Sequence, residues 1–128
     1  MSFFLGTFDP LPNDDMSEWT MEEPLTFVYE GVHLTAPKGY ITNLASVPRL
    51  LWMIWPPFGR YGKAAAIHDY LYTNKGFILT NDEVTHYTRS ECDEIFLAGM
   101  KTLGVNWFTQ LVLFAGVRVG GWWYWNKR

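Results

Sequence analysis

The sequence has one cysteine, no concentrated basic cluster and no long uncharged segment, and each absence excludes a class of protein. Because Cys92 stands alone, no intramolecular disulfide can form, so the core must stabilise the fold. The net charge is −3, and no cluster of four or more Lys or Arg occurs. Since phosphate binding requires a concentrated basic surface, nucleic acid is not expected as the main partner.

Neither a signal peptide nor a membrane-spanning helix is predicted. Met1 to Asp9 has no Lys or Arg before its short apolar patch, and Asp9 with Pro10 ends that patch too early for a secretory signal. The uncharged run from Val105 to Val117 has 13 residues, whereas a span needs roughly 20.

Hydrophobic and aromatic residues are plentiful. At 128 residues and 48% hydrophobic content, the chain is expected to form one compact domain, 1–128. The seven Trp, seven Tyr and nine Phe crowd into Leu50–Tyr61 and Trp107–Trp125. Such residues serve cores, interfaces and membrane-surface belts alike, so their density does not choose among these roles.

The order of the patterns predicts an α+β fold with three parts: an irregular N-terminal arm (1–24), a β region (25–48) and a helical region (49–128). In the β region, alternating residues around Gly31 predict a hairpin, and Tyr40–Thr42 is expected to add a third short strand. We therefore expect a small N-terminal antiparallel β-sheet followed by three helices.

Three helices are predicted after a short helical turn at Arg49–Trp55. The first begins at Lys63 and reaches Tyr72, the second runs from Arg89 to about Leu103, and the third from Asn106 to about Val119. A capping box formed by Thr88 and Glu91 marks the start of the second helix. The intervening stretch, 74–87, is interpreted as a connection.

The sharpest polar pattern lies on the first two helices. His68 and Tyr72 are four residues apart and share a face, whereas Asp69 projects about 100° away. Asp93 borders the apolar stripe of the second helix, so antiparallel packing would bring it to His68. We expect the first helix to pack on the Asp-bearing one, with His68, Tyr72 and Asp93 together.

Two roles for this His-Asp centre remain open. A carboxylate that holds one imidazole nitrogen lets the other take a proton from water, while Asp69 binds a hard cation with loop carbonyls from Phe58–Gly62. Alternatively, His68 and Asp93 lock the helices together as a closed polar clasp. The first role predicts a hydrolase that needs no serine or cysteine nucleophile.

Several separated motifs resemble one family. The stretches Thr42–Arg49, Pro56–Ala65, His68–Tyr72 and Arg89–Phe96 are similar to the phage and prophage family known as domain of unknown function 1353, over about Pro37–Trp125. The resemblance implies a phage or prophage origin but no activity. That family usually has Asp where this sequence has Asn43, a metal-ligand candidate that keeps an oxygen but lacks the charge.

The site alone also resembles secreted phospholipases of the A-two type, over about Phe58–Met100. This resemblance implies His68 as the base, Asp69 as the calcium ligand, and Asp93 as the supporting acid bonded by Tyr72. The disulfides common in those enzymes are missing here. On this basis we expect a phage-encoded hydrolase-like protein, with host-envelope lipid as a candidate substrate.

A non-enzymatic virion or tail-assembly protein is the alternative. The tryptophans Trp52, Trp55, Trp122, Trp123 and Trp125 would then contact phage structural proteins, whereas in a lipase they would rest on a membrane surface. Either role fits the virion or the host cytoplasm, and an oligomer is compatible with both.

Four remaining polar residues are given structural or surface roles. His33 in a strand and His86 in a polar loop are interpreted as surface residues, and Cys92 as a core residue. Arg118 is expected to be buried against a carboxylate or to lie at an interface.

Overall fold

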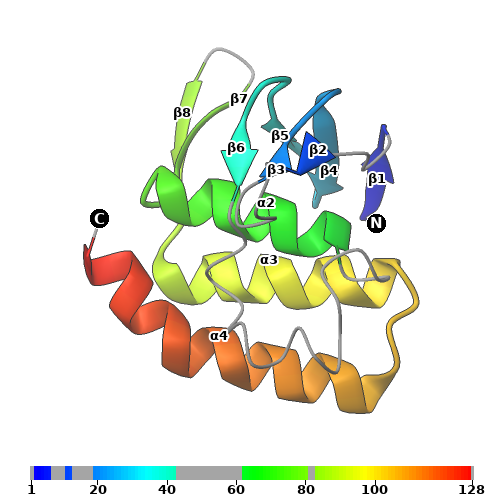
Figure 1. Ribbon diagram of the computed structural model, residues 1–128, viewed down its shortest axis with the longest axis vertical. Coiled ribbons are helices and arrows are strands. Elements are labelled where there is room, and N and C mark those ends of the chain that lie inside the picture. The colour runs from blue at the N-terminus through cyan, green and yellow to red at the C-terminus, as the bar shows by residue number, and fades with distance from the viewer. Residues whose placement is uncertain (1, 7–10, 13–18, 43–61, 81–82, 128) are drawn as a thin grey trace.

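The chain forms a stack of strands and helices in the computed structural model, which describes residues 2–6, 11–12, 19–42, 62–80 and 83–127. Helix α2 (Gly62–Thr73) lies between the strands and α3 (Arg89–Thr102), and α4 (Trp107–Lys127) packs on the far side of α3 (Figure 1). The expected α+β fold with antiparallel sheets and three helices is confirmed for these residues.

The predicted hairpin is the centre of the largest β layer. Strands β4 (Leu25–Tyr29) and β5 (Val32–Ala36) pair antiparallel around Glu30 and Gly31. Both turn residues have positive φ, 49° and 80°, which matches the two-residue turn that follows the twist of a hairpin. Alternate side chains of β4 and β5 face α2, so the hairpin provides one wall of the core.

The expectation of an irregular arm over 1–24 is wrong in part, because three short strands lie there. Strand β1 (Phe3–Leu5) pairs with β4, while β2 (Leu11–Pro12) and β3 (Trp19–Thr20) form a second sheet with β6 (Ile41–Thr42). Phe4 stacks on Phe27 with ring centroids 4.5 Å apart. These strands have only two or three residues, so their pairing depends on partners distant in sequence rather than on a local pattern.

The connection expected over 74–87 contains a hairpin, β7 (Phe77–Thr80) and β8 (Glu83–His86). Gly76 makes the exit from α2 possible, since its φ is +81° and a Cβ there would lie 1.9 Å from the carbonyl oxygen of Tyr87. The exposed side of the hairpin carries apolar Phe77 and Val84, so the sequence shows no alternation of buried apolar and exposed polar residues. Ile78 is the side chain that turns into the core.

Helix α3 begins with the predicted capping box. Thr88 Oγ1 accepts from the Glu91 amide at 3.2 Å, and Glu91 Oε1 accepts from the Thr88 amide at 2.9 Å. Gly99 faces Ala64 of α2, where a Cβ would lie 2.9 Å from the Ala64 Cβ. The two helices can approach closely here because both residues are small.

Helix α4 runs to Lys127, beyond the end expected near Val119. Gly120 and Gly121 weaken a helix but do not end this one. Trp125 packs edge-on against Tyr72, at 5.0 Å between centroids, and its carbonyl accepts from the Lys75 ammonium. Because these contacts hold the last turns against α2, tertiary packing overrides the local preference of the glycines.

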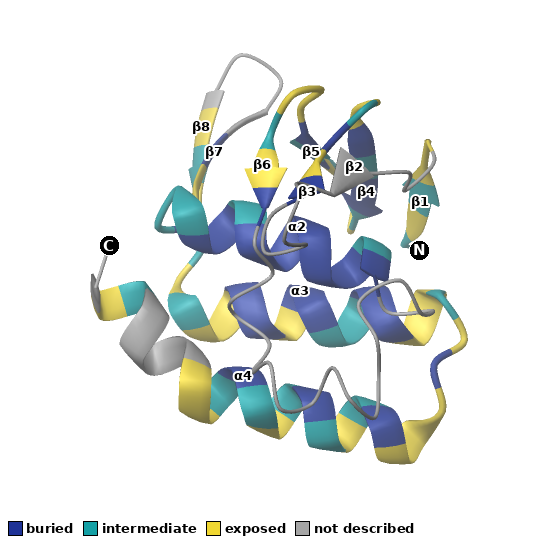
Figure 2. Cartoon of the chain, in the orientation of Figure 1, coloured by how far each residue is buried: buried dark blue, intermediate teal, exposed yellow. Residues whose placement is uncertain are grey.

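Burial is highest in α2, as the dark blue ribbon in Figure 2 shows, because this helix is covered by strands on one side and by α3 on the other. Its alanines, Ala65 and Ala66, are completely buried. Among the described residues, no helix has the length and hydropathy of a membrane span.

Candidate His-Asp site between three helices

His68 and Asp93 meet at the interface of α2 and α3, as the sequence pattern predicts. His68 Nε2 lies 2.6 Å from Asp93 Oδ1, and both side chains are fully buried. The His68 ring also packs against Phe96 at 5.0 Å between centroids. The carboxylate therefore contacts the imidazole at Nε2, which leaves Nδ1 as the ring nitrogen directed away from Asp93.

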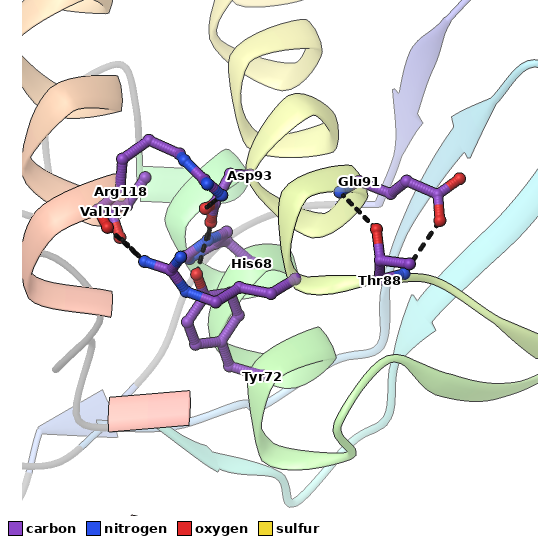
Figure 3. A network of polar contacts seen from close by, with 8 residues as sticks. His68, Tyr72, Thr88, Glu91, Asp93, Val117 and Arg118 are labelled. Carbon is purple, nitrogen blue, oxygen red and sulfur yellow. Dashed lines mark hydrogen bonds and ion pairs between the residues drawn. The ribbon is translucent and has the colours of Figure 1, made fainter. Parts of the chain in front are cut away.

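Two further groups bind the same carboxylate (Figure 3). The Tyr72 hydroxyl donates to Asp93 Oδ1 at 2.6 Å, and Arg118 Nη1 of α4 donates to Oδ2 at 2.8 Å. Arg118 was expected to be buried against a carboxylate or at an interface; the carboxylate contact is present, but its side chain is 37% exposed. Asp93 thus joins α2, α3 and α4 through three donors.

These contacts decide the ionisation of the carboxyl group. Burial raises the pKa of Asp93, but hydrogen bonds from His68, Tyr72 and Arg118, together with the attraction of the His68 charge, hold that pKa below its ordinary value. Burial and the bond to Asp93 raise the pKa of Tyr72. Tyr72 therefore remains a hydroxyl donor, and Asp93 remains an acceptor.

Arg89, at the start of α3, binds the backbone of α4 next to the same site. Its Nη2 donates to the carbonyl oxygen of Val117 at 3.3 Å and also to that of Arg118. The guanidinium thereby holds the stretch of α4 backbone that carries the Arg118 side chain. The sequence does not predict this contact, because the acceptors are main-chain carbonyl oxygens, which every residue has.

Asp69 projects about 100° from His68 around α2 and contacts the strands. Its Oδ2 accepts from Thr42 Oγ1 at 2.5 Å and from the Tyr40 hydroxyl at 2.9 Å, and Tyr40 also bonds to Thr73. Asp69 is 1% exposed, yet no residue in the described part of the chain donates a hydrogen bond to its Oδ1. A buried polar oxygen without a donor is uncommon in folded proteins.

Tyr40 and Thr42 were not singled out as site residues from the sequence. Tyr40 immediately precedes β6 and Thr42 is its last residue, so the period of a strand places both on one face. That spacing was the feature of the sequence by which the two residues could have been identified as neighbours in one site. Which carboxylate they would meet depends on how β6 packs on α2.

Several metal-ligand candidates fall outside the described residues, namely Asn43 and the loop carbonyls before Gly62. Within the described ranges, no group of three or more His, Cys, Asp or Glu could hold a metal ion.

The interface tryptophans can be followed only at the C-terminus. Trp52 and Trp55 lie outside the described residues, as do the side chains of Trp122 and Trp123. Trp125 is half-buried, where it covers Tyr72 and receives the Lys75 ammonium 5.6 Å from its ring centroid. It therefore packs within the fold, next to the His-Asp site.

The minor candidates occupy structural or surface positions. His33 is exposed in β5, and Cys92 is fully buried, where burial and the nearby acids Asp93 and Glu91 raise the thiol pKa to about 12. His86 was placed in a polar loop; it is instead the last residue of β8, exposed and packed against Phe77 with centroids 4.2 Å apart.

With this geometry established, comparison with protein families gives one match. The model of the family described as "Protein of unknown function (DUF1353)" matches residues 19–117, or 99 of the 128 residues. The chain belongs to this family. The match includes α2, α3 and the first half of α4, so His68, Asp69, Tyr72 and Asp93 fall inside it, whereas Arg118 lies one residue beyond its end. No curated protein and no solved structure matches the chain.

Proposed function

We propose that the chain is a hydrolase in which His68 is the general base. The observation that carries the proposal is the 2.6 Å contact between His68 Nε2 and the ionised Asp93. Because a carboxylate at Nε2 favours the proton on that nitrogen, the lone pair of a neutral imidazole lies on Nδ1. Nδ1 is then the atom that takes a proton from water.

With an ester substrate, the proposed hydrolysis proceeds in two steps. Nδ1 removes a proton from water as the oxygen attacks the carbonyl carbon, and Asp93 stabilises the imidazolium that results. When the tetrahedral intermediate collapses, the C–O bond to the alcohol breaks, and the imidazolium returns its proton to the leaving oxygen. The products are a carboxylic acid and an alcohol.

Tyr72 and Arg118 act as positioning residues in this proposal. They occupy Asp93 Oδ1 and Oδ2 from α2 and α4, so the carboxylate cannot rotate away from the imidazole. A base held in one orientation by a satisfied carboxylate loses little entropy when it reacts.

Asp69 is the proposed ligand for a hard cation, with Ca²⁺ the candidate and Asn43, next to Thr42, a candidate second ligand. The fit is supported by the orphaned Oδ1, since a buried carboxylate oxygen without a donor suits an oxygen-binding cation. When bound, such a cation polarises the ester carbonyl and stabilises its oxyanion.

Host-envelope lipid is the proposed substrate class, and a phage or prophage is the proposed origin. The site resembles phospholipases of the A-two type in its His68-Asp69 pair and in the two partners of Asp93, His68 and Tyr72. Esters of long-chain fatty acids are therefore the first substrates to test.

The test is release of fatty acid from phospholipid vesicles by the full chain, with Ca²⁺ or with a chelator. We expect His68→Asn to lose activity by about 100-fold or more while the far-ultraviolet circular dichroism spectrum is retained. His33→Asn, at an exposed histidine, is the matched control and should match the parent chain. Absence of turnover in the parent chain, or full activity in His68→Asn, would refute the proposal.

The complete burial of His68, Tyr72 and Asp93 favours a second candidate function, a non-enzymatic virion or tail-assembly protein. In that role the network only locks three helices, so His68→Asn lowers stability and impairs assembly without any loss of turnover. Mass spectrometry of purified virions tests this candidate directly. If the chain is absent from virions and does not bind virion proteins, this candidate is wrong.

A further inference from the structure

Helix α4 carries an apolar stripe on the side away from α3. The stripe consists of Trp107, Phe108, Leu111, Ala115 and Val119, and all five residues are exposed, with Trp107 at 75% and Val119 at 80%. Figure 2 shows exposed segments recurring along this outermost helix. Leu113 and Val117, on the opposite side, are completely buried against the core.

The charge around the stripe argues against an anionic partner. Between Trp107 and Val119 the sequence contains a single charged residue, Arg118, and its guanidinium is paired with Asp93. Helices that rest on anionic membranes or nucleic acid present Lys and Arg along their polar face. The whole chain carries a net charge of −3. An uncharged apolar surface is therefore a better partner for the stripe than an anionic one.

We propose that this stripe pairs antiparallel with the same stripe of a second copy of the chain. With the two-fold axis level with Leu113, Leu111 faces the partner subunit's Ala115, and Trp107 faces the partner subunit's Val119. Each larger side chain then opposes a smaller one, as interdigitating helices require. An interface of this kind uses one patch twice, and here the patch brings no like charges together.

The size of the stripe sets the strength of the pair. Twelve residue steps at about 1.5 Å each give a contact of about 18 Å. A stable interface buries roughly 800 Å² on each partner, and one helix face of this length supplies on the order of half that area. The dimer is therefore expected to dissociate at micromolar concentration, on the order of 10 μM. This inference does not depend on the proposed hydrolysis.

Sedimentation velocity of the full chain, from well below to well above roughly 10 μM, tests the proposal. We expect a concentration-dependent shift from monomer to dimer. Ala115→Arg, at the centre of the stripe, should remain monomeric throughout. Val84→Lys is the control, because Val84 is a 68% exposed apolar residue on β8, away from α4, and this variant should dimerise like the parent chain.

A mixing experiment tests the antiparallel register. Leu111→Glu and Ala115→Arg should each be monomeric alone, because each places a charge against an apolar surface of the second copy. Mixed in equal amounts, they should form a heterodimer, since the opposite charges face each other only in the proposed register. A monomeric parent chain at every concentration, a dimer that survives Ala115→Arg, or no heterodimer on mixing would overturn the proposal. So would a monomeric parent chain that floats with zwitterionic phosphatidylcholine vesicles through the same residues.

Discussion

Helix α2 separates two buried carboxylates whose surroundings differ. On the side of α3, Asp93 receives three donors on its two oxygens, and two of them, His68 and Arg118, can carry positive charge. On the side of the strands, Asp69 receives two neutral hydroxyl donors on one oxygen, and no described residue donates to its other oxygen. Both oxygens of Asp93 have donors, whereas only one oxygen of Asp69 has a donor among the described residues.

This difference shows that neighbours in sequence can have entirely different contacts. His68 and Asp69 are consecutive, but the helix turns them toward different layers of the fold. The Asp93 carboxylate can orient an imidazole and join helices. Asp69 has an oxygen to which no described residue donates, which is why we propose different roles for the two.

Asp93→Asn should have the largest effect on this comparison. The partners of both Asp93 oxygens donate hydrogen bonds, so the new amide NH₂ must face either Arg118 or the pair of Tyr72 and His68. We expect a loss of about 3 kcal/mol in the free energy of unfolding, measured by urea denaturation. A loss below about 1 kcal/mol would show that the network contributes little to stability.

The second-largest expected effect is that of acid, which should reduce the contribution of Asp93 to the stability of the fold. A carboxylate whose folded pKa lies below its unfolded value of 3.8 stabilises the fold fully above that value. That contribution is lost as the pH falls through the folded pKa. Urea midpoints from about pH 6 downward should therefore decline more steeply below pH 3.8 for the parent chain than for Asp93→Asn. Glu94→Gln, at an exposed position on the same helix, should keep the parent slope.

Paired tyrosine variants compare the two sides directly. Tyr72→Phe removes a fully buried donor to the ionised Asp93, so we expect a loss of about 2 kcal/mol in unfolding free energy. Tyr40→Phe removes a donor to Asp69 from a half-exposed ring, where water can replace it, so about 1 kcal/mol is expected. Equal losses would mean that the two carboxylates are held equally tightly.

Asp69→Asn should have the smallest effect on folding. The amide oxygen can keep the bonds from Thr42 and Tyr40, while the NH₂ group occupies the orphan position. The expected loss is below about 1 kcal/mol. If Asp69 holds a cation, the parent chain gains thermal stability on addition of CaCl₂, and this variant does not. An equal gain in both would place any calcium site elsewhere.

Much of the helical half of the fold could be predicted from local signals. Thr88 and Glu91 mark the start of α3, and the alanines before His68 mark α2. The short strands at Phe3–Leu5 and Trp19–Thr20 could not be predicted, because two or three residues carry no period and their partners lie far along the chain. The end of α4 was missed because Tyr72 and Lys75 stabilise turns that Gly120 and Gly121 weaken.

The sequence by itself predicted a meeting of His68 and Asp93, because helical period places His68 and Tyr72 on one face of the first helix and Asp93 beside the apolar face of the next. Only the tertiary structure decided that Asp69 faces β6, that Arg118 completes the Asp93 network, and that Arg89 holds the α4 backbone. The physical reason is the range of the interactions. Helix caps and faces depend on residues a few positions apart, whereas these contacts join elements that the packing of the whole chain brings together.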